Sequence, residues 1–194
     1  MAISPVADEV KMLTIFSTCG TERVYEEKLR SHVFRTQGNA VGDSLAAAKY
    51  IALHMQKDGL ETAGDGGSYY QVFGKGYRNL LGLLPGTDES LKDEVIVVGA
   101  HYDHVGYGSR TDSFGPYGTI HNGADDNASG TSAILEMIEA FDQLEVGPRR
   151  SILFCLWDGE EKGLLGSKHW LSAPTLSLEN VKFSINLDMI GRLR

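Results

Sequence analysis

The chain has 194 residues, of which 42% are hydrophobic and 23% are charged. This is the composition of an ordinary globular protein, and the length suffices for one domain with a substantial core. Lysine and arginine number 18 against 26 acidic residues, which gives a formal net charge of -8. No basic run has the pattern of a surface that follows a phosphate backbone, so nucleic acid is excluded as the expected partner.

The two cysteines, Cys19 and Cys155, are too few for a disulfide framework or a zinc site built on thiolates. Cys155 lies in an apolar run, where a free cysteine is expected to pack as a small hydrophobic side chain. No stretch reaches the roughly 18 apolar residues of a membrane span. Residues 11–19 are apolar only over a short distance and follow acidic residues, so they do not form a clear signal peptide.

In chain order, apolar residues at helical spacing occur first over residues 24–33 and then over residues 44–57. The second predicted helix has Asp43 or Ser44 as its N-cap and Gly59 as its C-terminal stop. Its apolar positions are Leu45, Ala48, Ile51, Ala52 and Met55.

Several strands are predicted next, and the first covers residues 69–73. The apolar runs 79–84 and 94–100 are separated by a turn-rich connection, which predicts an antiparallel hairpin. Residues 95–98 are apolar at every position, as in a strand covered on both faces. Residues 107–123 are rich in glycine and serine, and a loop of this length is usually functional or disordered.

The second half of the chain alternates between helices and strands. Helices are predicted over residues 130–144 and 164–171, and strands over residues 151–157 and 181–188. This alternation is typical of an α/β fold with a largely parallel sheet and helices on its faces. Ligands of such sheets gather at the carboxyl ends of the strands, so the polar segments that follow these strands are expected to meet at one edge.

Three polar segments directly follow predicted strands, and a fourth lies in a glycine-flanked loop just before the helix predicted over residues 130–144. Their chemically notable residues are His101 with Asp103, Asp125 with Asp126, Glu160 with Glu161, and Asp188. Each segment alone has a simpler interpretation: a hydrogen-bonded histidine, a helix cap or a solvated acidic turn. An unpaired Asp188 in its apolar strand end would be costly, which predicts a cation or several donors beside it. Together the segments predict two divalent metal ions bridged by a carboxylate, and ligands without thiolate favour zinc over manganese or cobalt.

The segments also suggest a division of roles. His101 offers one ring nitrogen to a metal, while Asp103 can accept the other ring N–H and fix the tautomer. The adjacent side chains of Glu160 and Glu161 cannot share one direction. This suits one carboxylate that binds metal and a neighbour that acts on a water molecule.

Four motifs resemble those of the co-catalytic di-zinc exopeptidases, a family that includes bacterial secreted leucyl aminopeptidases, glutamate carboxypeptidase and glutaminyl cyclase. They are residues 99–106 (GAHYDHVG), 122–130 (NGADDNASG), 157–167 (WDGEEKGLLGS) and 186–191 (NLDMIG). The resemblance implies a three-layer helix–sheet–helix fold with a mixed, mostly parallel central sheet, like that of the phosphorylase/hydrolase proteins. Residues 42–194 would form the catalytic domain, and residues 1–41 a partly helical N-terminal extension.

The resemblance further implies a role for each side chain. His101, Asp126 and Asp188 would hold one zinc ion, and Asp126 would bridge to a second zinc bound by Glu161. Glu160 would be the general base for an activated water that attacks a terminal peptide bond. The expected activity is therefore that of an exopeptidase on peptide substrates, with an aminopeptidase preferred over a carboxypeptidase.

Other outcomes share the same motifs. The family has a further zinc-ligating histidine downstream, and the sequence ends at Arg194, so we expect a truncated copy in which one zinc is weak or lost. A glutaminyl-peptide cyclase with a single zinc and a catalytically inactive fragment or interaction domain are the alternatives. Export to the periplasm or cell exterior is an expectation of the resemblance alone, and the sequence leaves the oligomeric state open.

Overall fold

A computed structural model describes most of the chain. The described residues are 14–16, 33–35, 40–108, 110, 117–121 and 123–191, with side chains from residue 45 onward. The helix predicted over residues 24–33 lies outside these ranges except for Val33, which begins strand β2. Cys19 also lies outside them. None of the helices within the described ranges has the length and apolar character that a membrane crossing requires.

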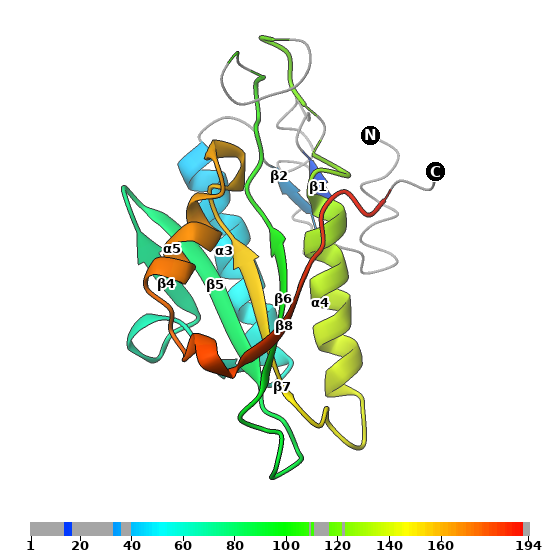
Figure 1. The fold of residues 1–194 in the computed structure, drawn as a ribbon. Coiled ribbons are helices and arrows are strands. Elements are labelled where there is room, and N and C mark those ends of the chain that lie inside the picture. Colours follow the sequence, from blue (N-terminus) through cyan, green and yellow to red (C-terminus); the bar gives the residue numbers. More distant parts are fainter. Residues whose placement is uncertain are drawn as a thin grey trace.

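A six-stranded mixed sheet forms the centre of the molecule (Figure 1). Its strands are β3 (Glu61–Thr62), β4 (Tyr70–Phe73), β5 (Tyr77–Leu84), β6 (Val95–His101), β7 (Ser151–Trp157) and β8 (Val181–Asn186). The strand order is β3-β5-β7-β6-β8, and β4 also pairs with β5. Strands β6, β7 and β8 run parallel, and β5 is antiparallel to β7. A separate parallel pair consists of β1 (Thr14–Phe16) and β2 (Val33–Arg35).

The predicted hairpin between residues 79–84 and 94–100 is wrong, because β7 lies between β5 and β6. All seven residues of β7 are buried, so this apolar strand takes the centre of the sheet. The connection from β5 to β6 passes across the start of β7, where the Gly86 N–H donates to Ser151 Oγ at 2.9 Å. Turn composition indicated the connection correctly but carried no information on which strand pairs with which.

Within the described residues, three α-helices cover the sheet: α3 (Ala40–Lys57), α4 (Ala128–Asp142) and α5 (Leu165–Ser172). Short 3-10 turns are η1 (Asp65–Gly67), η2 (Glu160–Lys162) and η3 (Leu178–Asn180). Helices α3 and α4 pack on one face, and α5 packs on the other through Trp170, whose ring centroid lies 5.9 Å from that of Trp157. The three-layer α/β arrangement is therefore confirmed.

Helix α3 differs from its prediction at its start. It begins at Ala40, so Asp43 and Ser44 lie inside the helix rather than at its N-cap. Gly59, just beyond its end, has a φ of +74°, which a residue with a side chain rarely adopts and which ends the helix. Four of the five predicted apolar positions are buried, and Leu45 is 40% exposed.

The three parallel strands end at the same edge of the sheet. His101 is the last residue of β6 and is paired in register with Trp157, the last residue of β7. Both strands are buried on both faces, as predicted, and Cys155 is completely buried. Within the described residues β8 is an edge strand and is largely exposed. The segments that follow β6, β7 and β8 form the candidate site.

Candidate metal centre

His101 lies at the base of the site and is 1% exposed. Its backbone carbonyl accepts a hydrogen bond from Thr131 Oγ1 at 2.9 Å, which fixes the end of β6 to α4. Its ring Nδ1 lies 3.1 Å from the backbone carbonyl oxygen of Asp103 and 3.5 Å from Asp103 Oδ1. Nδ1 therefore carries a hydrogen, and Nε2 faces the opposite side of the ring.

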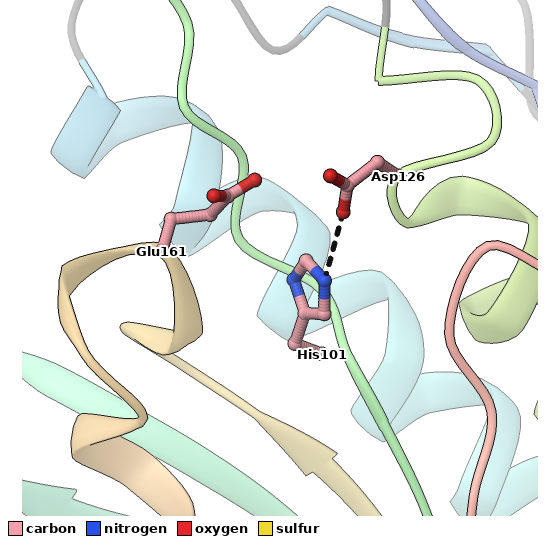
Figure 2. Close-up of side chains that lie close together, drawn as sticks. All are labelled: His101, Asp126 and Glu161. Atoms are coloured by element: carbon pink, nitrogen blue, oxygen red, sulfur yellow. Dashed lines mark hydrogen bonds and ion pairs between the residues drawn. The ribbon is translucent and has the colours of Figure 1, made fainter. Parts of the chain in front are cut away.

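Three carboxylates converge on Nε2 of His101. Asp126 Oδ1 lies at 3.1 Å, Asp188 Oδ1 at 3.6 Å and Glu160 Oε2 at 3.8 Å. Glu161 completes the set, because its ligand atom and those of His101 and Asp126 all lie within 4.8 Å of one another. Figure 2 shows these three side chains pointing toward a common space from three separate elements. The structure thus brings together all four predicted segments.

The electrostatics of this cluster require positive charge. Burial lowers the pKa of His101, but the hydrogen bonds to Asp103 and Asp126 and the charges of Asp103 and Glu160 outweigh it and raise the pKa to about 11. Carboxylates that converge on one nitrogen are stable only with a proton or a metal cation between them. A neutral imidazole with Nδ1–H directed at Asp103 and several carboxylate oxygens is a donor set that suits zinc.

Glu160 and Glu161 lie in η2, a turn bounded by two glycines. Gly159 has a φ of +68° and Gly163 a φ of +100°, so the left-handed backbone at each end favours glycine. Burial raises the pKa of Glu161 to about 8, and the negative charge of Asp126 adds to the effect. Burial also raises the pKa of Glu160.

Asp103 supports this turn as well as the histidine. Its Oδ1 accepts the backbone N–H of Glu160 at 3.0 Å, and its Oδ2 accepts that of Glu161 at 3.2 Å. The sequence predicted a contact of Asp103 with His101 but did not indicate this second contact. One carboxylate therefore contacts the histidine and the backbone of both acidic residues.

Asn127 connects the loop of Asp126 to the loop of Asp188, a role that was not predicted from the sequence. Its Oδ1 accepts the N–H of Gly130 at 3.0 Å and so caps α4, while its Nδ2 donates to the carbonyl oxygen of Leu187 at 2.9 Å. The residue that caps the helix is therefore Asn127 and not Asp125 or Asp126. Asparagine is a preferred N-cap residue, and this preference was the available signal.

Asp188 is not buried as predicted, since its side chain is 42% exposed. The physical reason is that β8 is an edge strand within the described residues, so its end is open to solvent. The segment after β8 is held by the neighbouring loop, where Asp125 Oδ1 accepts the N–H of Gly191 at 2.9 Å. Asp125 therefore supports the backbone after Asp188 and is not among the three residues of the metal-binding group.

Comparisons with known proteins identify the family of the chain. The model of Peptidase family M28 matches residues 79–194. A probable glutamate carboxypeptidase of Arthroderma benhamiae is 34% identical over 116 residues, which are 57% of this chain and 14% of that protein. Aminopeptidase YwaD of Bacillus subtilis is 40% identical over 117 residues, which are 59% of this chain and 22% of that protein.

A solved structure shows the same fold. The crystal structure of a leucine aminopeptidase precursor from Bacteroides thetaiotaomicron matches with a TM-score of 0.58 and 24% identity, and covers 77% of this chain and 55% of that chain. The chain thus spans only part of the proteins that it matches. The family match takes in more than half of the chain and all four segments of the site, and we conclude that the chain belongs to Peptidase family M28.

Proposed function

We propose that this chain carries the metal centre of a zinc exopeptidase that hydrolyses a terminal peptide bond, with aminopeptidase activity. The observation that carries the proposal is the convergence of Asp126, Asp188 and Glu160 on Nε2 of His101. Glu161 belongs to the same group as His101 and Asp126, whose ligand atoms lie close enough together to hold a metal ion. The identity of 40% with aminopeptidase YwaD, against 34% with the probable glutamate carboxypeptidase, supports an aminopeptidase.

The residues divide into two sets of ligands. His101, Asp126 and Asp188 would hold one zinc ion, and Asp126 would share a second ion with Glu161. Bound zinc lowers the pKa of a coordinated water molecule and stabilises the oxyanion of the attacked carbonyl group. Asp103 holds the imidazole of His101 in the tautomer that leaves Nε2 for the metal.

Glu160 would act as the general base. Its carboxylate lies beside the metal ligands without being needed as one, and burial raises its pKa above the ordinary value of a glutamate. A carboxylate whose pKa is raised is a stronger base, and it would accept the proton of the attacking water and then donate it to the leaving amine. The open side of the site, where the side chains of Asp126 and Asp188 are 44% and 42% exposed, leaves room for a peptide terminus.

The test combines zinc content with turnover. Purified protein is dialysed, its zinc is measured by elemental analysis, and hydrolysis of aminoacyl-anilides and of N-blocked peptides is assayed on the same sample. We expect bound zinc, hydrolysis that requires a free amino terminus, and a loss of turnover of about 10²–10⁴-fold in Glu160→Gln at unchanged zinc content.

Each alternative has its own result in this assay. Cyclisation of an N-terminal glutaminyl peptide with one zinc per chain would favour the cyclase. Zinc binding without turnover on any peptide would favour the inactive fragment or interaction domain. Full turnover in Glu160→Gln would assign the base to another residue.

A further inference from the structure

Two buried amide side chains lie behind the turn that carries Glu160 and Glu161. Asn79 of β5 is completely buried, and Gln71 of β4 is 1% exposed. Asn79 Nδ2 donates to Gln71 Oε1 at 3.0 Å, and Gln71 Nε2 donates to the carbonyl oxygen of Ala173 at 2.7 Å. Buried amides are costly unless their hydrogen bonds are made, and both of these are paired.

Asn79 also binds the segment that contains the turn. Its Oδ1 accepts the backbone N–H of Asp158 at 3.2 Å, and its Nδ2 donates to the carbonyl oxygen of Gly166 at 2.9 Å. These contacts lie at the two ends of residues 158–166, and Glu160 and Glu161 lie between them. One side chain therefore clamps both ends of the loop that presents the two acidic residues.

The fit of this clamp is close. A β-carbon at Gly166 would lie 2.2 Å from Asn79 Oδ1 and 2.5 Å from the carbonyl oxygen of Asp158, so no side chain can be placed there without a shift. The first end of the loop has a further attachment to β5, because Asp158 Oδ2 accepts the N–H of Arg78 at 2.9 Å. The loop is thus anchored on β5 at both ends.

We propose that Asn79 is a positioning residue for the metal centre, which sets the distance of Glu160 and Glu161 from His101 by clamping the ends of their loop. It contacts neither metal nor substrate and acts only through the backbone of Asp158 and Gly166. Groups that orient metal ligands in this indirect way change metal affinity by about 10–100-fold when they are removed. The effect on zinc and turnover rests on the proposed function, whereas the clamp itself does not.

Asn79→Leu and Gln71→Met form a matched pair of variants. Each replaces a buried amide with an apolar side chain of similar size, and each removes the hydrogen bond between the two side chains. Asn79→Leu alone removes the contacts with the loop ends. If Asn79 contributes only to stability, the two variants should behave alike at the metal centre.

Amide hydrogen exchange measures the clamp without any metal. We expect the amides of residues 158–166 to exchange at least about tenfold faster in Asn79→Leu than in Gln71→Met, while β6 and β7 remain protected in both. Equal exchange in the two variants would overturn the proposal. If Asn79→Leu does not fold, Gly166→Ala displaces the same clamp from the other side and is compared with the same control.

Zinc affinity, measured by competition with a chelator, tests whether the clamp affects the metal centre. We expect a dissociation constant that is about 10–100-fold weaker in Asn79→Leu, within about twofold of the parent in Gln71→Met, and a fall in kcat with little change in KM. Faster exchange together with parental zinc affinity would overturn the positioning role. If the parent chain itself binds no zinc, the proposed function fails, and the exchange experiment still decides the clamp.

Discussion

The carboxylate of Asp103 lies 3.5 Å from Nδ1 of His101 while it accepts the backbone N–H groups of Glu160 and Glu161. It thereby joins the end of β6 to the turn after β7, two segments that are almost 60 residues apart in the chain. This side chain connects the histidine directly to the acidic turn, whose ends are held separately by Asn79. A change at Asp103 should therefore affect both sides of the metal centre together.

Asp103→Asn tests this dual role. The amide keeps the size of the side chain but loses the negative charge, and its nitrogen cannot accept one of the two backbone N–H groups. We expect zinc affinity to fall by about 10–100-fold. The control is Asp65→Asn, because Asp65 also accepts a backbone N–H, that of Val72 at 3.2 Å, and lies beside β4. Equal zinc affinity in both variants would show that Asp103 does not organise the site.

Zinc binding should release protons, because the ligands must lose them to bind metal. The pKa of His101 is about 11 and that of Glu161 is about 8, so both groups are largely protonated at pH 7 before zinc binds. Affinity should therefore rise with pH, by about tenfold per pH unit for each proton released, and the slope should decrease as the pH passes 8.

Calorimetry in buffers with different heats of ionisation counts these protons. We expect about two protons per binding event at pH 7, and about one in Glu161→Gln, whose side chain does not titrate. An affinity that is the same at pH 6 and pH 8 would contradict the assigned ligands. Glu145→Gln, on the loop after α4, is the control and should leave the proton count unchanged.

The sequence predicted which segments meet at the sheet edge where a local pattern carried the information. His101 follows an apolar strand directly, and Glu160 and Glu161 follow another, so their meeting at one edge of a parallel sheet could be predicted. The fold class followed from the same alternation of apolar strands and helices. These features depend on residues that are close together in the chain.

The features that the sequence did not predict depend on distant partners. Asn79 contacts Gly166, 87 residues away, and Asn127 contacts Leu187, 60 residues away. A single asparagine has no periodicity that would reveal such a partner. The exposure of Asp188 was missed for a similar reason, because an apolar run does not show whether its strand lies at the centre or the edge of a sheet.

Two substitutions separate the two roles of Asn127, the N-cap of α4 and the contact with the loop of Asp188. Asn127→Ala removes the N-cap of α4 and should lower the free energy of unfolding by about 1 kcal/mol. Asn127→Asp keeps an oxygen that accepts the N–H of Gly130 but cannot donate to the carbonyl of Leu187. We expect this variant to retain most of the stability in urea unfolding and still to bind zinc more weakly, because the loop of Asp188 loses one of its two hydrogen bonds to this side chain and keeps only that from the N–H of Met189. If both variants bind zinc as tightly as the parent, Asn127 does not support the metal site.

Gly130→Ala should destabilise the protein, although helix propensity alone predicts that it stabilises α4. Gly130 lies in the first turn of α4, where alanine would favour the helix by up to about 1 kcal/mol. A β-carbon there, however, would lie 2.3 Å from the carbonyl oxygen of Leu187, a backbone atom that cannot rotate away. Overpacking of this kind costs about 1–3 kcal/mol, so we expect net destabilisation together with weaker zinc binding, since α4 and the end of β8 must separate. Denaturant unfolding with and without zinc measures both effects, and a variant more stable than the parent would show that the two elements are less tightly packed than the structure indicates.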